Sequence, residues 1–230
     1  MNGGKKMMLR KIKGLKYPEE YFVKFFFKNG LHQRDNLRIL EFGAGNGSNL
    51  MLPYEYGHEV CGVDFDASLI AFAKENFSLL EGGSQYHFIC DDMREFAKIP
   101  SFSSADILSF PNIINYISKD DFLLFLKNCR KNKIYKKGAV LYIRFRTPND
   151  FRYGYGKRVN AHSYRMDEND NFTGEAGALN CFYTESEMIE VLQKTLQLKK
   201  CQCFHVEFDN LCPGGDIIHN SDIVLWGEIH

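Results

Sequence analysis

The sequence lacks any run of about 18 or more consecutive apolar residues, which is the length that a membrane-spanning helix needs. Its basic N-terminus is not followed by the apolar stretch of a secretory signal peptide. It also lacks an excess of either charge, because 29 Lys and Arg residues balance 29 Asp and Glu residues. A neutral chain has no general field that attracts nucleic acid or an anionic membrane. We therefore expect a soluble, cytoplasmic protein that binds neither.

The seven cysteines have neither the even, regular spacing of a disulfide framework nor the paired spacing of a zinc site. Several lie in apolar, strand-like runs such as "EVCGV" and "HFIC", which is typical of small buried side chains. Cys201 and Cys203 would point to one face of a strand, but no His or Cys pair at zinc spacing accompanies them. We predict no metal site and no disulfide framework.

Apolar runs alternate with segments of helical periodicity along most of the chain. Strands of this kind indicate a parallel sheet with helices on both faces, and the last two, separated by a short turn-rich loop, predict an antiparallel hairpin. The predicted fold class is α/β, a doubly wound, mostly parallel seven-stranded sheet with a C-terminal antiparallel hairpin. The predicted strands are 37–42, 59–64, 86–90, 105–110, 138–146, 199–208 and 222–229. The predicted helices are 17–30, a short helix ending before Gly57, 67–77, 118–133 and 184–195.

The stretch "ILEFGAGNGSNL" places three glycines, Gly43, Gly45 and Gly47, directly after the first predicted strand. A dinucleotide-binding loop needs its third glycine one position later, where this chain has Ser48. Glu41 also precedes the loop, and a carboxylate there repels a pyrophosphate but suits a ligand with a positive charge. The simpler alternative is that the glycines only turn the chain.

Further polar groups follow the next two strands, at the edge of the sheet where ligands bind in open α/β folds. Asp64 ends the second strand and can accept two hydroxyl hydrogen bonds from a ribose. Phe65, beside it, can cover the face of an adenine. Asp92 and the backbone of Met93 follow the third strand, where an adenine edge can be read. Together these residues predict a nucleoside-containing ligand.

With these motifs the chain resembles the class I S-adenosylmethionine-dependent methyltransferases, which have a Rossmann-like fold. "LEFGAGNG" is similar to their first motif, "VDFD" to the second, "DDM" to the motif after the third strand and "ADILSFPNIINYI" to the fourth. The resemblance implies S-adenosylmethionine as cofactor and S-adenosylhomocysteine as product. The cofactor-binding residues that we expect from it are Tyr17 in a "YP" segment, Glu41, Gly43, Ala44, Gly45, Gly47, Asn49, Asp64, Phe65, Asp92, Met93 and Phe110.

The resemblance also implies a role for each matching residue. The glycines would surround the methionine moiety, and Glu41 would orient the loop and the ligand's ammonium group. Asp64 would bind the ribose, Asp92 the adenine amino group and the Met93 N–H the adenine ring. Phe110 would form the pocket wall.

We expect one methyltransferase domain over 1–230. It consists of an N-terminal helical segment over 1–36, a cofactor-binding half over 37–146, an insertion over 147–183, and the C-terminal helix and hairpin over 184–230. The insertion is rich in Gly, Asn and Asp and has no sustained period. Such a stretch within a compact domain is usually a functional loop or lid, or else disordered, and we interpret it as a substrate lid.

The insertion and the strand before it hold six cations within 22 positions, with one acid among them. One interpretation is that solvent or nearby carboxylates neutralise them. The other is a clamp for an anionic acceptor, because guanidinium forks match carboxylate and phosphate groups. The substrate-binding candidates are Arg144, Arg146, Arg152, Lys157 and Arg158.

A hydroxyl acceptor would need a base, for which we nominate His162, with Asp150, Tyr155, Tyr153 and His205 as reserves. Motif four, "SFPN", does not match enzymes that methylate the amino groups of bases or glutamine, and no cysteine lies beside it for methylation of pyrimidine carbons. The hypothesis is methyl transfer to a small anionic acceptor by a monomer or homodimer, with O-methylation favoured and a sugar or nucleotide-linked metabolite as one target class. The alternatives are a non-catalytic cofactor-binding or interaction module, a protein or peptide methyltransferase and a dinucleotide-dependent oxidoreductase.

Overall fold

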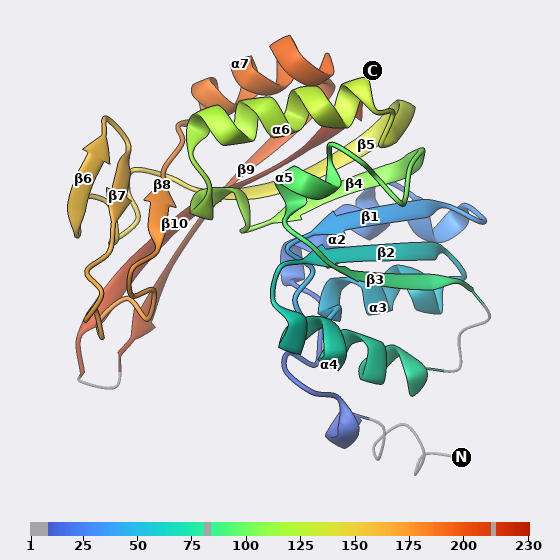
Figure 1. Ribbon diagram of the computed structural model, residues 1–230, viewed down its shortest axis with the longest axis horizontal. Helices are drawn as coiled ribbons and strands as arrows, with labels where there is room; N and C mark the ends of the chain where they lie inside the picture. The colour runs from blue at the N-terminus through green and yellow to red at the C-terminus, as the bar shows by residue number, and fades with distance from the viewer. Residues whose placement is uncertain (1–8, 81–83, 213–214) are drawn as a thin grey trace.

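The main sheet has seven strands in the order β3-β2-β1-β4-β5-β10-β9 (Figure 1). The computed structural model describes residues 9–80, 84–212 and 215–230. β1 to β5 pair in parallel, whereas β10 is antiparallel to both β5 and β9. The predicted fold class is confirmed, although residues 213 and 214 of the expected hairpin turn lie outside the described residues. The strands are β1 Arg38–Phe42, β2 Glu59–Asp64, β3 Tyr86–Cys90, β4 Ala105–Pro111, β5 Tyr135–Arg146, β9 Lys199–Leu211 and β10 Ile217–Ile229.

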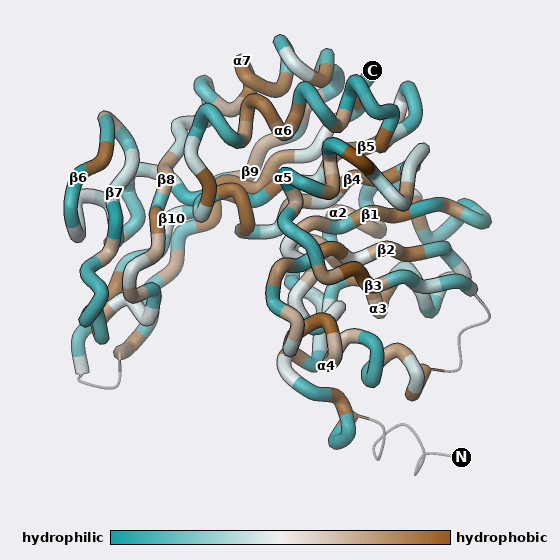
Figure 2. The backbone as a smooth tube through the Cα atoms, in the orientation of Figure 1, coloured by the Kyte–Doolittle hydropathy of each residue, from teal (hydrophilic) through white to brown (hydrophobic). Residues whose placement is uncertain are grey.

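Helices cover both faces of this sheet, as the alternation along β5 illustrates. Leu141 and Ile143 join one apolar cluster, which includes buried residues of α5, α6 and α7. Tyr142 points to the opposite cluster, which includes α2, α3 and α4. Figure 2 shows the apolar residues concentrated along the central strands. The helices are α2 Glu20–Lys28, α3 Ser48–Glu55, α4 Ala67–Ser78, α5 Met93–Phe96, α6 Lys119–Lys131 and α7 Glu185–Leu196, with short 3₁₀ turns η1 Leu31–Gln33 and η2 Ile114–Tyr116.

The order of the strands fixes where a ligand can bind. β1 and β4 are neighbours, and the chain leaves them toward opposite sides of the sheet. In open α/β sheets such a reversal opens a crevice at the carboxyl ends of the strands. The glycine loop, which follows β1, and the segment after β4 therefore meet at this point.

The insertion over 147–183 has regular secondary structure, so the expectation of a structureless loop was wrong, while its role as a substrate lid stays a prediction. It contains a three-stranded antiparallel sheet formed by β6 Lys157–Asn160, β7 Ser163–Arg165 and β8 Leu179–Cys181. These strands have only three or four residues, and a register shift interrupts the first pair, so no apolar alternation is visible in the sequence.

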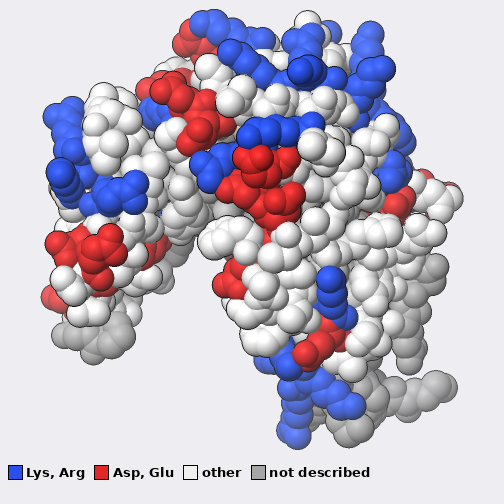
Figure 3. All heavy atoms as spheres, in the orientation of Figure 1, with Lys and Arg blue, Asp and Glu red and all other residues white. Residues whose placement is uncertain are grey.

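The small sheet lies beside the distal part of the β9–β10 hairpin (Figure 1). Two backbone hydrogen bonds hold the start of the insertion to β10, from the Thr147 N–H to the Ser221 carbonyl and from the Phe151 N–H to the His219 carbonyl, each 2.9 Å long. Figure 3 shows a hollow between this projecting part and the body of the molecule. Within the described ranges no helix has both the length and the hydrophobicity to cross a membrane.

The start of α7 depends on a reciprocal cap that the sequence predicts. The Thr184 side chain accepts from the Glu187 N–H, and the Glu187 carboxylate accepts from the Thr184 N–H at 2.8 Å. Thr184→Ala removes one half of this capping box, and we expect it to lower the free energy of unfolding by about 1 kcal/mol. Urea denaturation measures the effect, with Gln193→Ala on the exposed face of α7 as control. Equal midpoints for the two variants would contradict the prediction.

Candidate functional site

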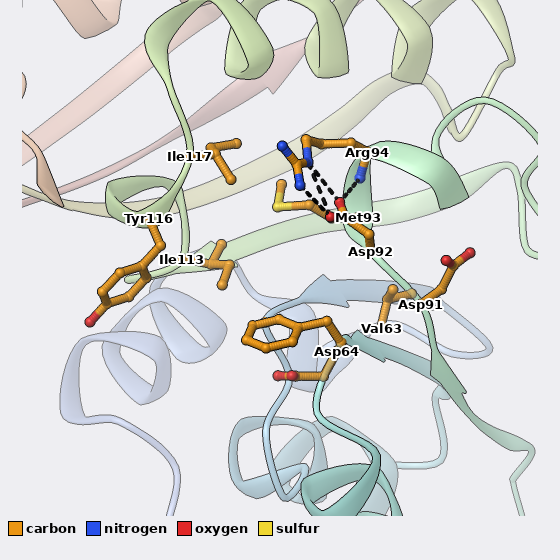
Figure 4. Close-up of a pocket in the computed structure, with 11 residues that line it drawn as sticks. Val63, Asp64, Asp91, Asp92, Met93, Arg94, Ile113, Tyr116 and Ile117 are labelled. Carbon is orange, nitrogen blue, oxygen red and sulfur yellow. Dashed lines mark hydrogen bonds and ion pairs between the residues drawn. The ribbon is translucent and has the colours of Figure 1, made fainter. Parts of the chain in front are cut away.

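Two adjoining cavities lie at the carboxyl ends of the parallel strands, and Gly43 lines both. Figure 4 shows the first of them. The first cavity is lined by Gly43, Val63, Asp64, Phe65, Asp91, Asp92, Met93, Arg94, Ile113, Tyr116 and Ile117. The second is lined by Leu15, Tyr17, Pro18, Glu19, Glu41, Gly43, Ala44, Gly45, Asn46, Ser48, Asn49, Pro111 and Asn112.

The three glycines of the loop serve different purposes. All have positive φ angles, +70° at Gly43, +53° at Gly45 and +79° at Gly47, where a side chain is strained. A Cβ atom at Gly43 would lie 2.7 Å from Ile113, and one at Gly47 would lie 2.9 Å from Phe77. At Gly45 a Cβ would meet nothing within 4 Å. Only Gly45 therefore leaves open space toward the cavity, while the other two permit close packing.

Asp64 is buried at the end of β2 and is held by the backbone on both oxygens. The Gly45 N–H donates to Oδ2 at 2.8 Å, and the Asp66 N–H donates to Oδ1 at 3.0 Å. Each carboxylate oxygen can accept a second hydrogen bond, so Asp64 keeps the capacity for two ligand hydroxyls. The same contact ties the glycine loop to β2.

Glu41 is a buried carboxylate in the wall of the second cavity, with a 1% exposed surface. It accepts hydrogen bonds from Ser109 Oγ at 2.8 Å and from Asn49 Nδ2 at 3.3 Å. Burial raises its pKa to about 8, and the nearby charges of Glu19 and Asp64 add to this, although the two hydrogen bonds oppose it. A cationic ligand group in this cavity would favour the ionised form.

The N-terminal segment that carries Tyr17 crosses the glycine loop. The Glu19 N–H donates to Asn49 Oδ1 at 2.8 Å, and Asn46 Nδ2 donates to the Lys13 carbonyl at 2.7 Å. This segment therefore forms one wall of the second cavity.

The end of β3 supplies the opposite side of the first cavity. Asp92 begins α5 and accepts from the Arg94 N–H at 2.8 Å and from Arg94 Nε at 2.9 Å. The two side chains point toward each other in Figure 4. The Arg94 guanidinium, despite partial burial of the carboxyl group, keeps the pKa of Asp92 below its ordinary value. Asp92 is thus an ionised acceptor at neutral pH.

Most of the expected cofactor residues line the two cavities, but Gly47 and Phe110 do not. Phe110 is fully buried and stacks on Phe42, with ring centroids 5.7 Å apart. Strand alternation turns it to the α6 face of β4, so its assignment as a pocket wall is corrected. Pro111 and Asn112, the next two residues, form the wall instead.

Several lining residues were not among the expected ones. Ile113, Tyr116 and Ile117 follow β4 in the "PNIINYI" stretch, and Arg94 lies two residues after Asp92. Their positions just beyond strand ends are the signal that would have found them.

The arginines of the proposed clamp are paired with carboxylates inside the protein. Arg144 contacts Glu19 and lies 2.6 Å from Asp222 Oδ2. Arg146 donates to both oxygens of Glu175, at 2.9 and 2.6 Å. These partners differ from the acids of the insertion that lie closest to the cations in sequence.

The other predicted cations divide into a buried and an exposed group. Arg152 Nη1 donates to Asp150 Oδ1 at 3.0 Å, and its Nε lies 3.2 Å from Glu175. Lys157 and Arg158 are exposed on β6. The anion clamp remains a prediction. Arg146 and Arg152 lie together because both contact Glu175, whereas Arg144, Lys157 and Arg158 do not contact it.

The base candidates lie outside the linings of the two cavities, which come from residues 15–117. His162 Nδ1 is 3.1 Å from the Tyr153 hydroxyl in the small sheet. Asp150 is buried against Arg152, and the Tyr155 hydroxyl is 3.5 Å from Asp170 Oδ1. Their catalytic roles stay predictions.

His205 is exposed on β9 and pairs with Glu185 at 2.8 Å. Its position is therefore accounted for by a hydrogen bond with the start of α7.

Comparison with known proteins finds one matching family model and several structures with a similar fold. Residues 39–132 match the sequence model of a methyltransferase domain. No curated protein matches the chain.

Three structures illustrate the likeness of the fold. A SAM-dependent methyltransferase from Methanosarcina mazei is 18% identical, with a TM-score of 0.62 over 87% of this chain and 96% of that one. The Synechocystis magnesium protoporphyrin IX methyltransferase, with bound SAM, is 12% identical, with a TM-score of 0.58 over 99% and 84%. The Burkholderia thailandensis 1,6-didemethyltoxoflavin N1-methyltransferase is 14% identical, with a TM-score of 0.55 over 90% and 76%. At these identities the likeness shows the fold.

The different surroundings of the loop glycines predict different costs of substitution. Gly45→Ala meets only backbone strain, and we expect a loss of stability of about 1–2 kcal/mol. Gly43→Ala adds a clash with Ile113, and we expect a loss of roughly 2–5 kcal/mol. Urea denaturation of the two variants compares them directly. An equal loss in both would show that Ile113 does not restrict position 43.

The raised pKa of Glu41 predicts a pH-dependent stability. Its folded-state pKa of about 8 lies above the ordinary value of 4.5, so its favourable contribution is present below pH 4.5 and is lost as pH rises through 8. Glu41→Gln keeps an acceptor oxygen for Ser109 but cannot ionise. We expect the variant to gain stability relative to wild type by up to about 1.4 kcal/mol per pH unit across this window. Parallel stability curves for the two proteins from urea unfolding would exclude the shift.

Proposed function

We propose that the protein transfers a methyl group from S-adenosylmethionine to a small anionic acceptor, because residues 39–132 match the sequence model of a methyltransferase domain and the chain has the fold of SAM-dependent methyltransferases. The observation that carries this proposal is the pair of adjoining cavities that share Gly43. One has the groups that bind an adenosine, and the other has the buried acid that a cationic amino-acid tail requires.

The chemistry of the lining residues fits this cofactor. Asp64 has two free acceptor positions for ribose hydroxyls, and Phe65 and Met93 supply apolar surface for an adenine. In the second cavity, Glu41 lies near Glu19, and Gly45 leaves room for the tail. These carboxylates would compensate the positive charges of the sulfonium and ammonium groups.

S-adenosylmethionine supplies an electrophilic methyl group, so the protein mainly aligns the acceptor and excludes water. The segment after β4 bounds both cavities and provides the surface against which an acceptor would be aligned. For a hydroxyl acceptor, His162, Asp150 and Tyr155 are the proposed bases, and each would have to approach the cavity from the insertion.

O-methylation of an anionic metabolite, with sugars and nucleotide-linked compounds as one class, is the finer part of the proposal. The cationic insertion supports an anionic acceptor, since six Lys and Arg residues lie between 144 and 165. The aromatic, glycine-rich stretch 151–156 supports a small acceptor by analogy with substrate-covering loops.

Calorimetry with S-adenosylhomocysteine and with NAD tests the cofactor. We expect S-adenosylhomocysteine to bind and NAD not to bind. Asp64→Asn should weaken the binding by about 10- to 100-fold, because a hydrogen bond to a charged group contributes about 1.5–3 kcal/mol. Asp209→Asn, at an exposed His219 pair, is the control and should bind as wild type does. Binding of NAD without S-adenosylhomocysteine would refute the proposed function.

A further inference from the structure

A cluster of hydrogen-bond donors surrounds the Glu175 carboxylate, with Arg146 and Asn180 buried and Tyr116 at its exposed edge. Arg146 donates to both carboxylate oxygens, and the Tyr116 hydroxyl donates to Oε1 at 3.0 Å. Arg152 Nε lies 3.2 Å from Oε1, while Asn180 Oδ1 accepts a hydrogen bond from Arg146. The side chains of Arg146 and Arg152 are only 9% and 13% exposed. Guanidinium groups shielded from water in this way bind carboxylate and phosphate groups through paired hydrogen bonds, which makes the binding selective.

Glu175 does not satisfy all the donors in this cluster. Asn180 is completely buried, and its Nδ2 has no hydrogen-bond partner in the part of the chain that the structure describes. Arg152 Nε forms its ion pair with Glu175 without hydrogen-bond geometry. Unsatisfied buried donors are rare because each costs free energy. The surplus donors can bind more acceptor atoms than one carboxylate offers.

The cluster is joined to the cofactor cavity through Tyr116. This residue lines the first cavity, and Figure 4 shows its hydroxyl pointing away from Asp64. The Arg146 guanidinium donates to that hydroxyl at 2.9 Å, and the Arg146 N–H donates to Asn115 Oδ1 at 3.0 Å. An anion held here would therefore lie next to the wall of the cavity.

Glu175 is placed on the chain where it can leave the cluster. It belongs to the connection between β7 and β8 and lies between Gly174 and Gly177, both with positive φ angles. A Cβ at Gly174 would meet nothing within 4 Å, so the turn is open on that side of Glu175, whereas a Cβ at Gly177 would lie 2.6 Å from Glu168 Oε2. Moving Glu175 would break no pairing within the small sheet.

The charge of the cluster is preserved if another anion replaces Glu175. Burial raises the pKa of Glu175, but the hydrogen bond from Arg146 and the charges of Arg146 and Arg152 outweigh it, so the pKa lies below its ordinary value. Glu175 is therefore ionised at neutral pH. An external carboxylate or phosphate would exchange one anion for another and leave no guanidinium unpaired.

We propose that Arg146, Arg152, Tyr116 and Asn180 form the binding site for the anionic group of the methyl acceptor, and that Glu175 occupies this site in the absence of acceptor. The inference rests on the proposed function and narrows it. Arg144 is left out because Glu19 and Asp222 pair with it from two sides. Lys157 and Arg158 are left out because they are exposed on β6.

Anion binding to Glu175→Ala tests this site without knowledge of the acceptor. Acetate and inorganic phosphate are the probes, each compared with chloride at equal ionic strength, and the thermal unfolding midpoint is the measurement. We expect both probes to raise the midpoint of the variant in the concentration-dependent manner of single-site binding. Wild type should respond only at concentrations roughly tenfold higher or more, because the probe must displace Glu175. The more effective probe identifies the acceptor group as carboxylate or phosphate.

Two controls and one replacement variant make the outcome decisive. Glu59→Ala breaks the Arg38 ion pair at the other end of the sheet and should give no such response. Arg146→Met combined with Glu175→Ala should abolish it. If Glu175→Ala does not fold, Glu175→Gln, which keeps one acceptor oxygen, takes its place.

Two results would overturn the inference. One is an absence of any anion effect on the Glu175 variants. The other is an effect on the variants with none on wild type at any concentration, which would make Glu175 a fixed structural counter-ion. S-adenosylhomocysteine binding by the same proteins separates these failures from a failure of the proposed function.

Discussion

The buried carboxylate of Glu41 is the constraint around which the ligand-binding edge of the sheet is arranged. It cannot remain in the apolar interior without donors, and Ser109 from β4 and Asn49 from α3 provide them. Asn49 in turn accepts from the Glu19 N–H, which fixes the N-terminal segment over the glycine loop. One desolvated acid thus joins two strands, a helix and the start of the chain. The cavity beside it has an acidic wall, where a cationic ligand group would favour the ionised form of Glu41 over the protonated one.

The sequence predicts the parallel sheet and the ligand-bearing strand ends because both follow from local patterns. Apolar runs mark the strands, and Asp64 and Asp92 come directly after two of them. The separate roles of the glycines could not be predicted, because they depend on Ile113 and Phe77, which are distant in sequence. The assignment of Phe110 failed for a related reason, since the face to which a strand residue points depends on its register in the sheet.

The arginines show a second limit of sequence reasoning. Their number and spacing predict that anions neutralise them, but the sequence does not specify which carboxylate pairs with which arginine. The fold assigns Arg144 to Glu19 and Asp222, more than 70 positions away on either side, and Arg146 to Glu175. Long-range pairing of this kind is set by sheet order and by the path of the insertion along the hairpin. The three short strands of that insertion were invisible for the same reason, because neighbouring segments stabilise them.

The division of the chain at the end of β4 has a consequence for mutations. Residues 15–117 line both cavities, whereas the buried arginines and their carboxylate partner come from residues 146–175. Under the proposed function, mutations in the second region would alter what is methylated without changing the residues that line the donor cavities. Tyr116 is the exception, because it contacts both regions. A substitution of Tyr116 would therefore affect the lining of the first cavity and also leave Arg146 without one of its hydrogen-bond partners.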